Sequence, residues 1–131
     1  MANQIPMVDY LVLGDAPHLV AQKCTACGAL FLDRRNACAS CGGREFGTQA
    51  LPSDGVVRAF TIVHRAAPGV PAPFASAVIG LAGGVKVKAN IVGVEPTPEK
   101  ISLGMKVKLT TFVAGTDSQG TEAVAFGFAP A

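Results

Sequence analysis

CTACG at residues 24–28 and CASCG at residues 38–42 are two Cys-x2-Cys pairs, each followed by glycine, and they decide the fold of the segment around them. A glycine after the second cysteine tolerates the positive φ of a tight turn, which leaves backbone N–H groups free to point at sulfur. Two such turns supply four thiolates, the tetrahedral ligand set of closed structural zinc sites. The sequence therefore predicts one structural Zn²⁺ per chain, bound by Cys24, Cys27, Cys38 and Cys41.

The segment around the cysteines, residues 19–47, supports a metal without deciding which one. It is too short to bury the apolar surface that a fold of its own needs, so metal binding would supply folding free energy. Arg34 and Arg35 can offset the net negative charge of four thiolates around a divalent ion. Iron in a rubredoxin-like site takes the same four ligands, and a Cys-x2-Cys pair can also be a redox pair. Two symmetric pairs favour structural zinc.

The cysteine usage and the start of the chain indicate a cytoplasmic protein. The first positive charge is Lys23, so the basic start of a signal peptide is missing. No apolar run reaches the ~18 residues of a membrane span. Structural disulfides are rare in the cytosol, which again favours a metal for the four cysteines. We therefore expect a cytoplasmic chain with no membrane association.

From residue 55 onward the sequence has the pattern of β-strands, with β-branched and apolar residues alternating with polar ones. Between Val85 and Ile91, apolar positions alternate with Lys86, Lys88 and Asn90, so the lysines should lie on the face away from the core. Strands are predicted at 56–65, 75–82, 85–94, 105–113 and 123–128. Five short strands in about 75 residues fit a small Greek-key barrel of the OB type.

The predicted fold class is mainly β, with a small four-cysteine zinc ribbon followed by a five-stranded OB-like Greek-key barrel. The expected parts are an N-terminal arm at 1–18, the zinc ribbon at 19–47, a linker at 48–54 and the OB-fold barrel at 55–131. The arm is either a short helix or a segment that lies on a partner. Pro52 and Asp54 mark the linker, because both residue types favour turns.

Composition excludes several classes of protein. Half of the residues (50%) are hydrophobic and only 15% are charged, which rules out intrinsic disorder. The net charge of +2 is too small to drive binding to a phosphate backbone. So apolar a chain has either a large core for its size or an apolar surface that another protein covers.

Catalytic groups are scarce in this sequence. The chain has two histidines, His18 and His64, and its acidic residues are scattered without a local acid–base pair. A zinc ion saturated by four cysteines has no open position for water or substrate. We expect no catalytic residues in this chain alone.

The lysines of two predicted strands allow two interpretations. Lys86 and Lys88, together with Lys106 and Lys108, form either a solvated face or a positive patch that receives a nucleotide or phosphate group. An OB barrel that binds single-stranded nucleic acid stacks bases on aromatic side chains, and aromatics are only 6% of this chain. A free-standing single-stranded nucleic-acid-binding protein is therefore the second candidate function.

The order of these motifs resembles a known protein family. The run from His18 to Leu30 holds the first cysteine pair. It is followed by Arg34-Arg35-x2-Cys-x2-Cys, a linker, a Gly-led strand, a Pro-rich loop and strands that end in Phe-Ala-Pro. This order is similar to that of the acyl-CoA-associated proteins that join a rubredoxin-like zinc ribbon to an OB fold. The resemblance covers about residues 18–130, nearly the whole chain.

The resemblance implies a function as well as a fold. Members of this family are non-catalytic subunits of thiolases, hydroxymethylglutaryl-CoA synthases or hydratases, and the partner and the OB domain can share a CoA channel. The resemblance therefore implies a thiolase-like catalytic subunit as the partner in a hetero-oligomer. In such an acyl-CoA acyltransferase complex, this chain would stabilise the partner and help to form the site for the CoA thioester. The family's four metal ligands correspond to the four cysteines.

The loop before the third cysteine departs from the common family pattern. Many members have Pro-Pro-Arg where this chain has Leu32-Asp33-Arg34, so no role tied to those prolines is expected. The run from Asp33 to Asn36 is similar to the small subunits of benzoylsuccinyl-CoA-type thiolases.

Four residues are predicted to contact CoA or the partner: Arg65, Phe74, Lys86 and Lys88. The Pro-rich loop at 68–74 would form one wall of the acyl-CoA entrance, because proline fixes the shape of a loop. Phe74 at its end can stack on adenine or fill a pocket of the partner. The alternative is an ordinary rigid loop with no such contact.

Overall fold

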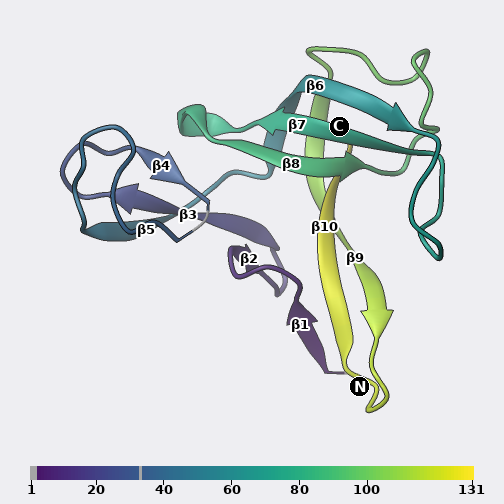
Figure 1. Cartoon of the computed structure of the whole chain (residues 1–131), viewed down its shortest axis with the longest axis horizontal. Coiled ribbons are helices and arrows are strands. Elements are labelled where there is room, and N and C mark those ends of the chain that lie inside the picture. Colours follow the sequence, from purple (N-terminus) through teal and green to yellow (C-terminus); the bar gives the residue numbers. More distant parts are fainter. Residues whose placement is uncertain (1–2, 33) are drawn as a thin grey trace.

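The computed structural model describes residues 3–32 and 34–131, and it consists almost entirely of strands (Figure 1). Residues 1–2 of the predicted arm and Asp33 of the loop between the cysteine pairs lie outside the described residues. No helix in the described part of the chain is long and apolar enough to cross a membrane. The elements are β1 (Gln4–Pro6), β2 (Leu11–Val12), β3 (His18–Cys24), β4 (Leu30–Phe31), β5 (Phe46–Ala50), β6 (Asp54–Val63), β7 (Phe74–Gly80), the 3-10 turn η1 (Ala82–Gly84), β8 (Lys86–Ile91), β9 (Lys106–Thr116) and β10 (Glu122–Pro130).

Strands β6 to β10 form a closed five-stranded barrel, as the sequence predicts. The strand order is β10-β8-β7-β6-β9, and β9 pairs back with β10 to close the ring. All pairings within this ring are antiparallel except β10 with β8, which is parallel through Phe128 and Ile91. This is the Greek-key connectivity of the OB fold.

The barrel core is apolar and follows the predicted alternation. Along β8 every second residue is buried, while Lys86, Lys88 and Asn90 are exposed, so the predicted facing of this strand is confirmed. Phe128 and Ile79 are fully buried in the same core. Complete burial of one such side chain stabilises the fold by about 1.5–3 kcal/mol.

The zinc ribbon is a second sheet built around β3. This strand pairs antiparallel with β2, β4 and β5, and β5 runs through Ala50, which lies opposite Val20. Residues 48–50, predicted to be linker, are therefore part of a strand. Their side chains are exposed and backbone hydrogen bonds to β3 hold them, while only Phe46 at the start of β5 packs against a neighbour, the ring of Phe31, so the sequence shows no apolar alternation over 48–50. The buried side chain of Leu51 then joins the common core of ribbon and barrel.

The N-terminal arm is made of two short strands, not the short helix that was one of its two predicted forms. β1 pairs parallel with β10 through Gln4 and Pro6, and β2 pairs with β3 of the ribbon. The side chain of Leu11 in β2 is buried in the common core. The arm thus connects the ribbon sheet to the last strand of the barrel.

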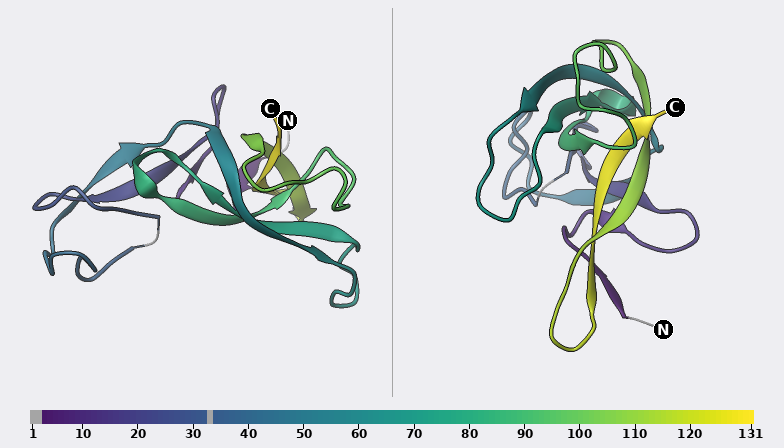
Figure 2. Two further views of the ribbon diagram at one scale, coloured as in Figure 1. Left: turned by 90° about the horizontal axis from the view of Figure 1, so that it is seen from above. Right: turned by 90° about the vertical axis from the view of Figure 1, so that its right-hand side faces the viewer.

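The β9–β10 hairpin is longer than predicted and extends beyond the barrel, with β1 beside it (Figures 1 and 2). At its tip, Asp117 Oδ1 accepts hydrogen bonds from the backbone N–H groups of Gln119 and Thr121, both at 2.9 Å. An aspartate that bonds to the backbone two residues on is a common turn device. The hairpin therefore has a defined tip outside the barrel core.

Candidate metal centre and the adjoining grooves

The two cysteine pairs form the tight turns that the sequence predicts. In the first, the N–H of Gly28 donates to the carbonyl of Cys24 at 2.9 Å, and in the second that of Gly42 donates to Cys38 at 2.8 Å. Gly28 and Gly42 have φ values of 80° and 78°, which residues with a side chain rarely adopt. The glycines are therefore required by the turns.

The four sulfur atoms lie close enough together to share one metal ion. The Sγ atoms of Cys24 and Cys41 are 3.6 Å apart, those of Cys27 and Cys38 are 3.5 Å apart, and all four lie within 4.8 Å of one another. A tetrahedron with Zn–S bonds of about 2.3 Å has edges of about 3.8 Å. The donor set and its spacing fit a structural zinc site with four cysteine ligands, and the ribbon can hold one zinc ion.

Backbone N–H groups stabilise the thiolate forms of two ligands. Burial raises the pKa of Cys38, but the N–H groups of Cys41 and Ser40 outweigh it and hold that pKa at about 6. The N–H of Cys27 is the main cause that lowers the pKa of Cys24. Hydrogen bonds to the charged form of a group favour that form. The turns thus prepare sulfur atoms for a cation.

Cys41 shows why the cluster needs that cation. The N–H of Gly43 lowers the pKa of Cys41, but the neighbouring Cys24 and Cys27 side chains raise it to about 12. Negative sulfur atoms this close repel one another, so the last thiol holds its proton. A divalent ion bound by these cysteines would offset that repulsion with its positive charge, so that the remaining thiol could release its proton.

Gly43 is a part of the site that the sequence did not single out. A β-carbon at this position would come within 3.3 Å of the Sγ atoms of both Cys24 and Cys41. That distance is tighter than nearly all real contacts of this kind, and the neighbours are the metal ligands themselves. The second glycine of the Cys41-Gly42-Gly43 run therefore leaves room for the sulfur cluster.

A groove with three cations runs between the zinc ribbon and the barrel. We call it the ribbon–barrel groove. Its volume is about 370 Å³, and Arg35, Lys86 and Lys88 line it, with no acidic residue among the described lining residues. The guanidinium of Arg35 lies 4.6 Å from the centre of the Phe31 ring, a cation–π contact. Within the described chain these three cations form no ion pair, so the groove is positively charged. Its full lining is Tyr10, Leu30, Phe31, Leu32, Arg35, Gly84, Val85, Lys86, Val87 and Lys88.

The other two predicted contacts lie at the far end of the barrel. Phe74 is the first residue of β7 and is half-buried opposite Val63, whereas Gly80 at the end of β7 lies opposite Lys86. Six residues of extended chain span about 20 Å. Arg65 is exposed in the loop that follows β6. The four predicted contacts therefore do not form one site: Lys86 and Lys88 share the ribbon–barrel groove, and Arg65 and Phe74 do not.

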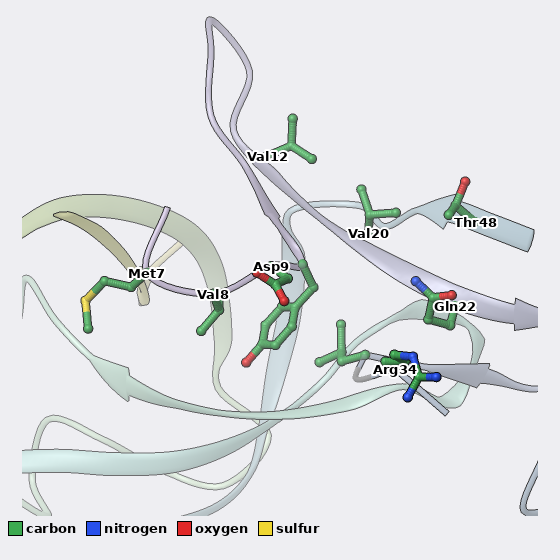
Figure 3. A pocket seen from close by; sticks show the side chains of 10 residues that line it. Met7, Val8, Asp9, Val12, Val20, Gln22, Arg34 and Thr48 are labelled. Carbon is green, nitrogen blue, oxygen red and sulfur yellow. The ribbon is translucent and has the colours of Figure 1, made fainter. Parts of the chain in front are cut away.

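A second, more apolar pocket adjoins the ribbon–barrel groove (Figure 3). We call it the arm pocket. Its volume is about 810 Å³, and in Figure 3 Met7 of the arm lies at one end while Gln22 and Arg34 lie at the other. Tyr10 and Leu32 line both hollows, so they form the wall between them. The arm pocket is lined by Met7, Val8, Asp9, Tyr10, Val12, Val20, Gln22, Leu32, Arg34 and Thr48.

Two curated proteins are similar to this chain, each over only part of its own length. The chain is 32% identical over 92 residues to the probable enoyl-CoA hydratase alpha subunit of Thermomonospora curvata, covering 70% of this chain and 28% of that protein. It is 30% identical over 93 residues to a DUF35 domain-containing scaffold protein of Methanocaldococcus jannaschii, covering 69% of this chain and 64% of that protein. The matched region thus spans less than two thirds of each of these relatives.

Two solved structures share the fold. The Ltp2-ChsH2(DUF35) aldolase contains a chain with a TM-score of 0.72 and 29% identity, over 86% of this chain and 84% of that one. A DUF35 protein of unknown function from Sulfolobus solfataricus has a TM-score of 0.52 and 19% identity, over 80% of this chain and 74% of that one. The second likeness concerns the fold alone.

Family models account for both domains. The rubredoxin-like zinc ribbon domain of ChsH2 matches residues 13–47, and the C-terminal OB-fold domain of ChsH2 matches residues 48–112. Together they cover the metal centre, the lining of the ribbon–barrel groove except Tyr10, and the barrel strands β6 to β8. The chain belongs to the DUF35 family and has the zinc ribbon and the OB-fold domain of its ChsH2 members.

Proposed function

We propose that this chain is a non-catalytic scaffold subunit of an acyl-CoA enzyme and that its ribbon–barrel groove receives the phosphate groups of the CoA thioester. The observation that carries the proposal is the position of Arg35, Lys86 and Lys88 around one groove without an acidic partner among the described residues. The names of two relatives support the enzyme class, since one is a probable enoyl-CoA hydratase subunit and another a scaffold protein.

The chemistry of the groove suits the nucleotide end of CoA. Guanidinium and ammonium groups bind phosphate oxygens with charge-assisted hydrogen bonds, and Arg35 can do so with two parallel bonds. Phe31 already holds Arg35 in place through the cation–π contact. The adjoining arm pocket supplies apolar side chains such as Met7 and Val12 for the less polar remainder of the ligand. One CoA thioester would therefore occupy both hollows and pass over the side chains of Tyr10 and Leu32, which line both.

We further propose that the catalytic partner is a thiolase-type subunit in a hetero-oligomer. The family resemblance supports this choice, and a zinc ion saturated by four cysteines leaves the acyl-transfer chemistry to the partner's own nucleophile and base. In the complex, this chain would bind and orient CoA, exclude water from the entrance and stabilise the partner. Arg65 and Phe74 remain predicted contacts of CoA or of the partner at the far end of the barrel.

Co-expression with a thiolase-type subunit from the same organism tests this function. We expect one complex in size-exclusion chromatography, thiolysis of an acyl-CoA by that complex, and no thiolysis by this chain alone. A complex with a hydratase-type or aldolase-type subunit instead would show that the thiolase assignment is wrong and the scaffold role right. If none of these enzymes associates with the chain, the scaffold proposal fails.

Binding of single-stranded nucleic acid is the alternative function, because the OB barrel and its exposed lysines are compatible with it. Its aromatic side chains argue against it, because Tyr10 packs edge-on against Phe126, and Phe126 against Phe128, with ring centroids 5.9 and 6.3 Å apart. These contacts occupy part of each ring, and Phe128 is fully buried, so this cluster is a poor platform for stacking bases. A titration with a single-stranded oligonucleotide separates the two functions, since a true binder must show an affinity that falls steeply with salt.

A further inference from the structure

Three segments at the projecting end of the molecule are almost free of charge, although the hairpin tip between two of them carries Asp117. Three neighbouring segments, residues 3–8, 109–116 and 122–130, contain a single charged residue, Glu122, which accepts a hydrogen bond from Gln4 at 2.9 Å. Large apolar side chains are nevertheless exposed there, with Met7 at 57% and Val113 at 46%. Depletion of charge together with exposed apolar side chains is typical of the centre of a protein–protein interface.

The outer half of β9 also has an unpaired edge. On the side of β6, β9 pairs only through Lys106–Lys108, and the N–H of Leu109 then donates to the carbonyl of Ser53 at 2.9 Å. Because successive residues of a strand point their backbone groups to alternate sides, Thr111 and Val113 face the same side as Leu109. No described residue pairs with them on that side, while β10 occupies the other.

This edge lacks the usual protection against pairing. Exposed edges in natural proteins carry lysine, proline or a bulge that keeps other strands away. Residues Thr110–Val113 contain neither a charge nor a proline. The register shift between β9 and β10 comes only after Val113, where Ala114 is the extra residue. A short, regular stretch of edge therefore stays open to another strand.

A hollow beside the edge could receive a side chain of an added strand. Its volume is about 190 Å³, and its lining includes Leu13, Pro17, Phe112, Val113 and Val124. When a strand is added to a sheet edge, the backbone hydrogen bonds supply affinity and pockets for alternate side chains supply specificity. Edge and hollow together have the parts that this mode of recognition needs.

We propose that the β9 edge at Thr110–Val113 is the docking site of the catalytic subunit, which adds an extended, uncharged segment to β9 and inserts an apolar side chain into the hollow. This inference rests on the proposed scaffold function. A second copy of the chain fits the edge less well, because two paired four-residue segments bury far less than the roughly 1,200–2,000 Å² of a stable interface. A larger enzyme subunit can also cover Ile5 and Met7 on the opposite side of the hairpin.

Two edge variants and one control test the inference in the full-length protein. Thr111→Pro removes a backbone N–H from the open side only, and Val113→Lys places a charge on the edge. Leu103→Lys is the control, because Leu103 is apolar and 67% exposed but lies before β9. Each is co-expressed with the thiolase-type subunit, and zinc content and thermal unfolding confirm the fold of each variant.

We expect wild type and Leu103→Lys to capture the subunit equally and both edge variants to capture at least about tenfold less. In the wild-type complex, hydrogen exchange at the amides of Thr111 and Val113 should slow at least about tenfold, which contact through side chains alone would not cause. Equal capture by folded edge variants would overturn the docking site and leave the scaffold function intact. A wild-type chain that captures no subunit would overturn both. A chain that is dimeric alone, and monomeric as Val113→Lys, would show that a second copy occupies the edge.

Discussion

Gly43 approaches Cys24 so closely that a β-carbon on Gly43 would lie 3.3 Å from the Cys24 sulfur. The same β-carbon would lie 3.3 Å from the sulfur of Cys41, so both contacts involve metal ligands. Cys24 belongs to the first cysteine pair, whereas Gly43 follows the second pair. A zinc ion bound by both pairs would hold the two turns together. The space beside the sulfur cluster is therefore a part of the metal site.

Gly43→Ala should weaken zinc binding. The added methyl group must displace at least one ligand sulfur by a few tenths of an ångström, and changes next to metal ligands typically cost about 10–100-fold in affinity. Competition with a chromophoric chelator would measure the change. Gly47→Ala is the matched control, since a β-carbon at Gly47 meets nothing within 4 Å. Equal zinc affinity in both variants would show that the sulfur cluster tolerates the methyl group.

Removal of the metal should unfold the ribbon and weaken the barrel. The ribbon sheet is small, and its strand β5 and the two cysteine turns contribute little to the apolar core, so we expect these parts to depend on zinc. Leu19 and Leu51 are buried in the core shared with the barrel, so the loss should extend there. We expect about one zinc per chain by elemental analysis. With excess chelator, thermal unfolding should begin at a clearly lower temperature, and a chain whose unfolding curve ignores the chelator would contradict this expectation.

Charge reversal in the ribbon–barrel groove should weaken the use of acyl-CoA. Lys86→Glu or Lys88→Glu removes an attraction for phosphate and adds a repulsion, so we expect KM of the complex for acyl-CoA to rise about tenfold, since hydrogen bonds to charged groups are worth about 1.5–3 kcal/mol. Steady-state kinetics of the assembled complex would measure it. Lys100→Glu, at an exposed lysine outside the groove lining, is the control. A rise in KM of the same size for Lys100→Glu would indicate general electrostatics rather than a site.

Phe74→Ala tests the predicted wall of the acyl-CoA entrance separately. If Phe74 contacts CoA or the partner near the entrance, the variant should raise KM for acyl-CoA several-fold, because an aromatic contact is worth about 0.5–1.5 kcal/mol beyond its buried area. Size-exclusion chromatography must show intact assembly, since Phe74 is half-buried at the start of β7. An unchanged KM in an intact complex would remove the Pro-rich loop from the list of CoA contacts.

Local chemistry explains what could be read from the sequence. The metal centre was predictable because the spacing of Cys24 and Cys27, repeated at Cys38 and Cys41, fixes two turns whose geometry depends on a few adjacent residues. The barrel strands were predictable because burial of one face imposes a period of two on residues such as those around Lys86. Strand β5 was not predicted, because its side chains after Phe46 are all exposed. Such a strand shows no alternation of apolar and polar residues in the sequence.

The sequence by itself determined the four cysteines that can hold a metal, the class of fold and the facing of strand β8. Only the tertiary structure decided which distant residues meet. It brought Arg35 of the ribbon beside Lys86 and Lys88 of the barrel, and it placed Phe74 at the other end of β7. The physical reason is that ribbon and barrel share one apolar core, and the packing of buried side chains such as Leu19 and Val85 sets how their surfaces face each other. Such packing depends on the whole chain and leaves no local signature in the sequence.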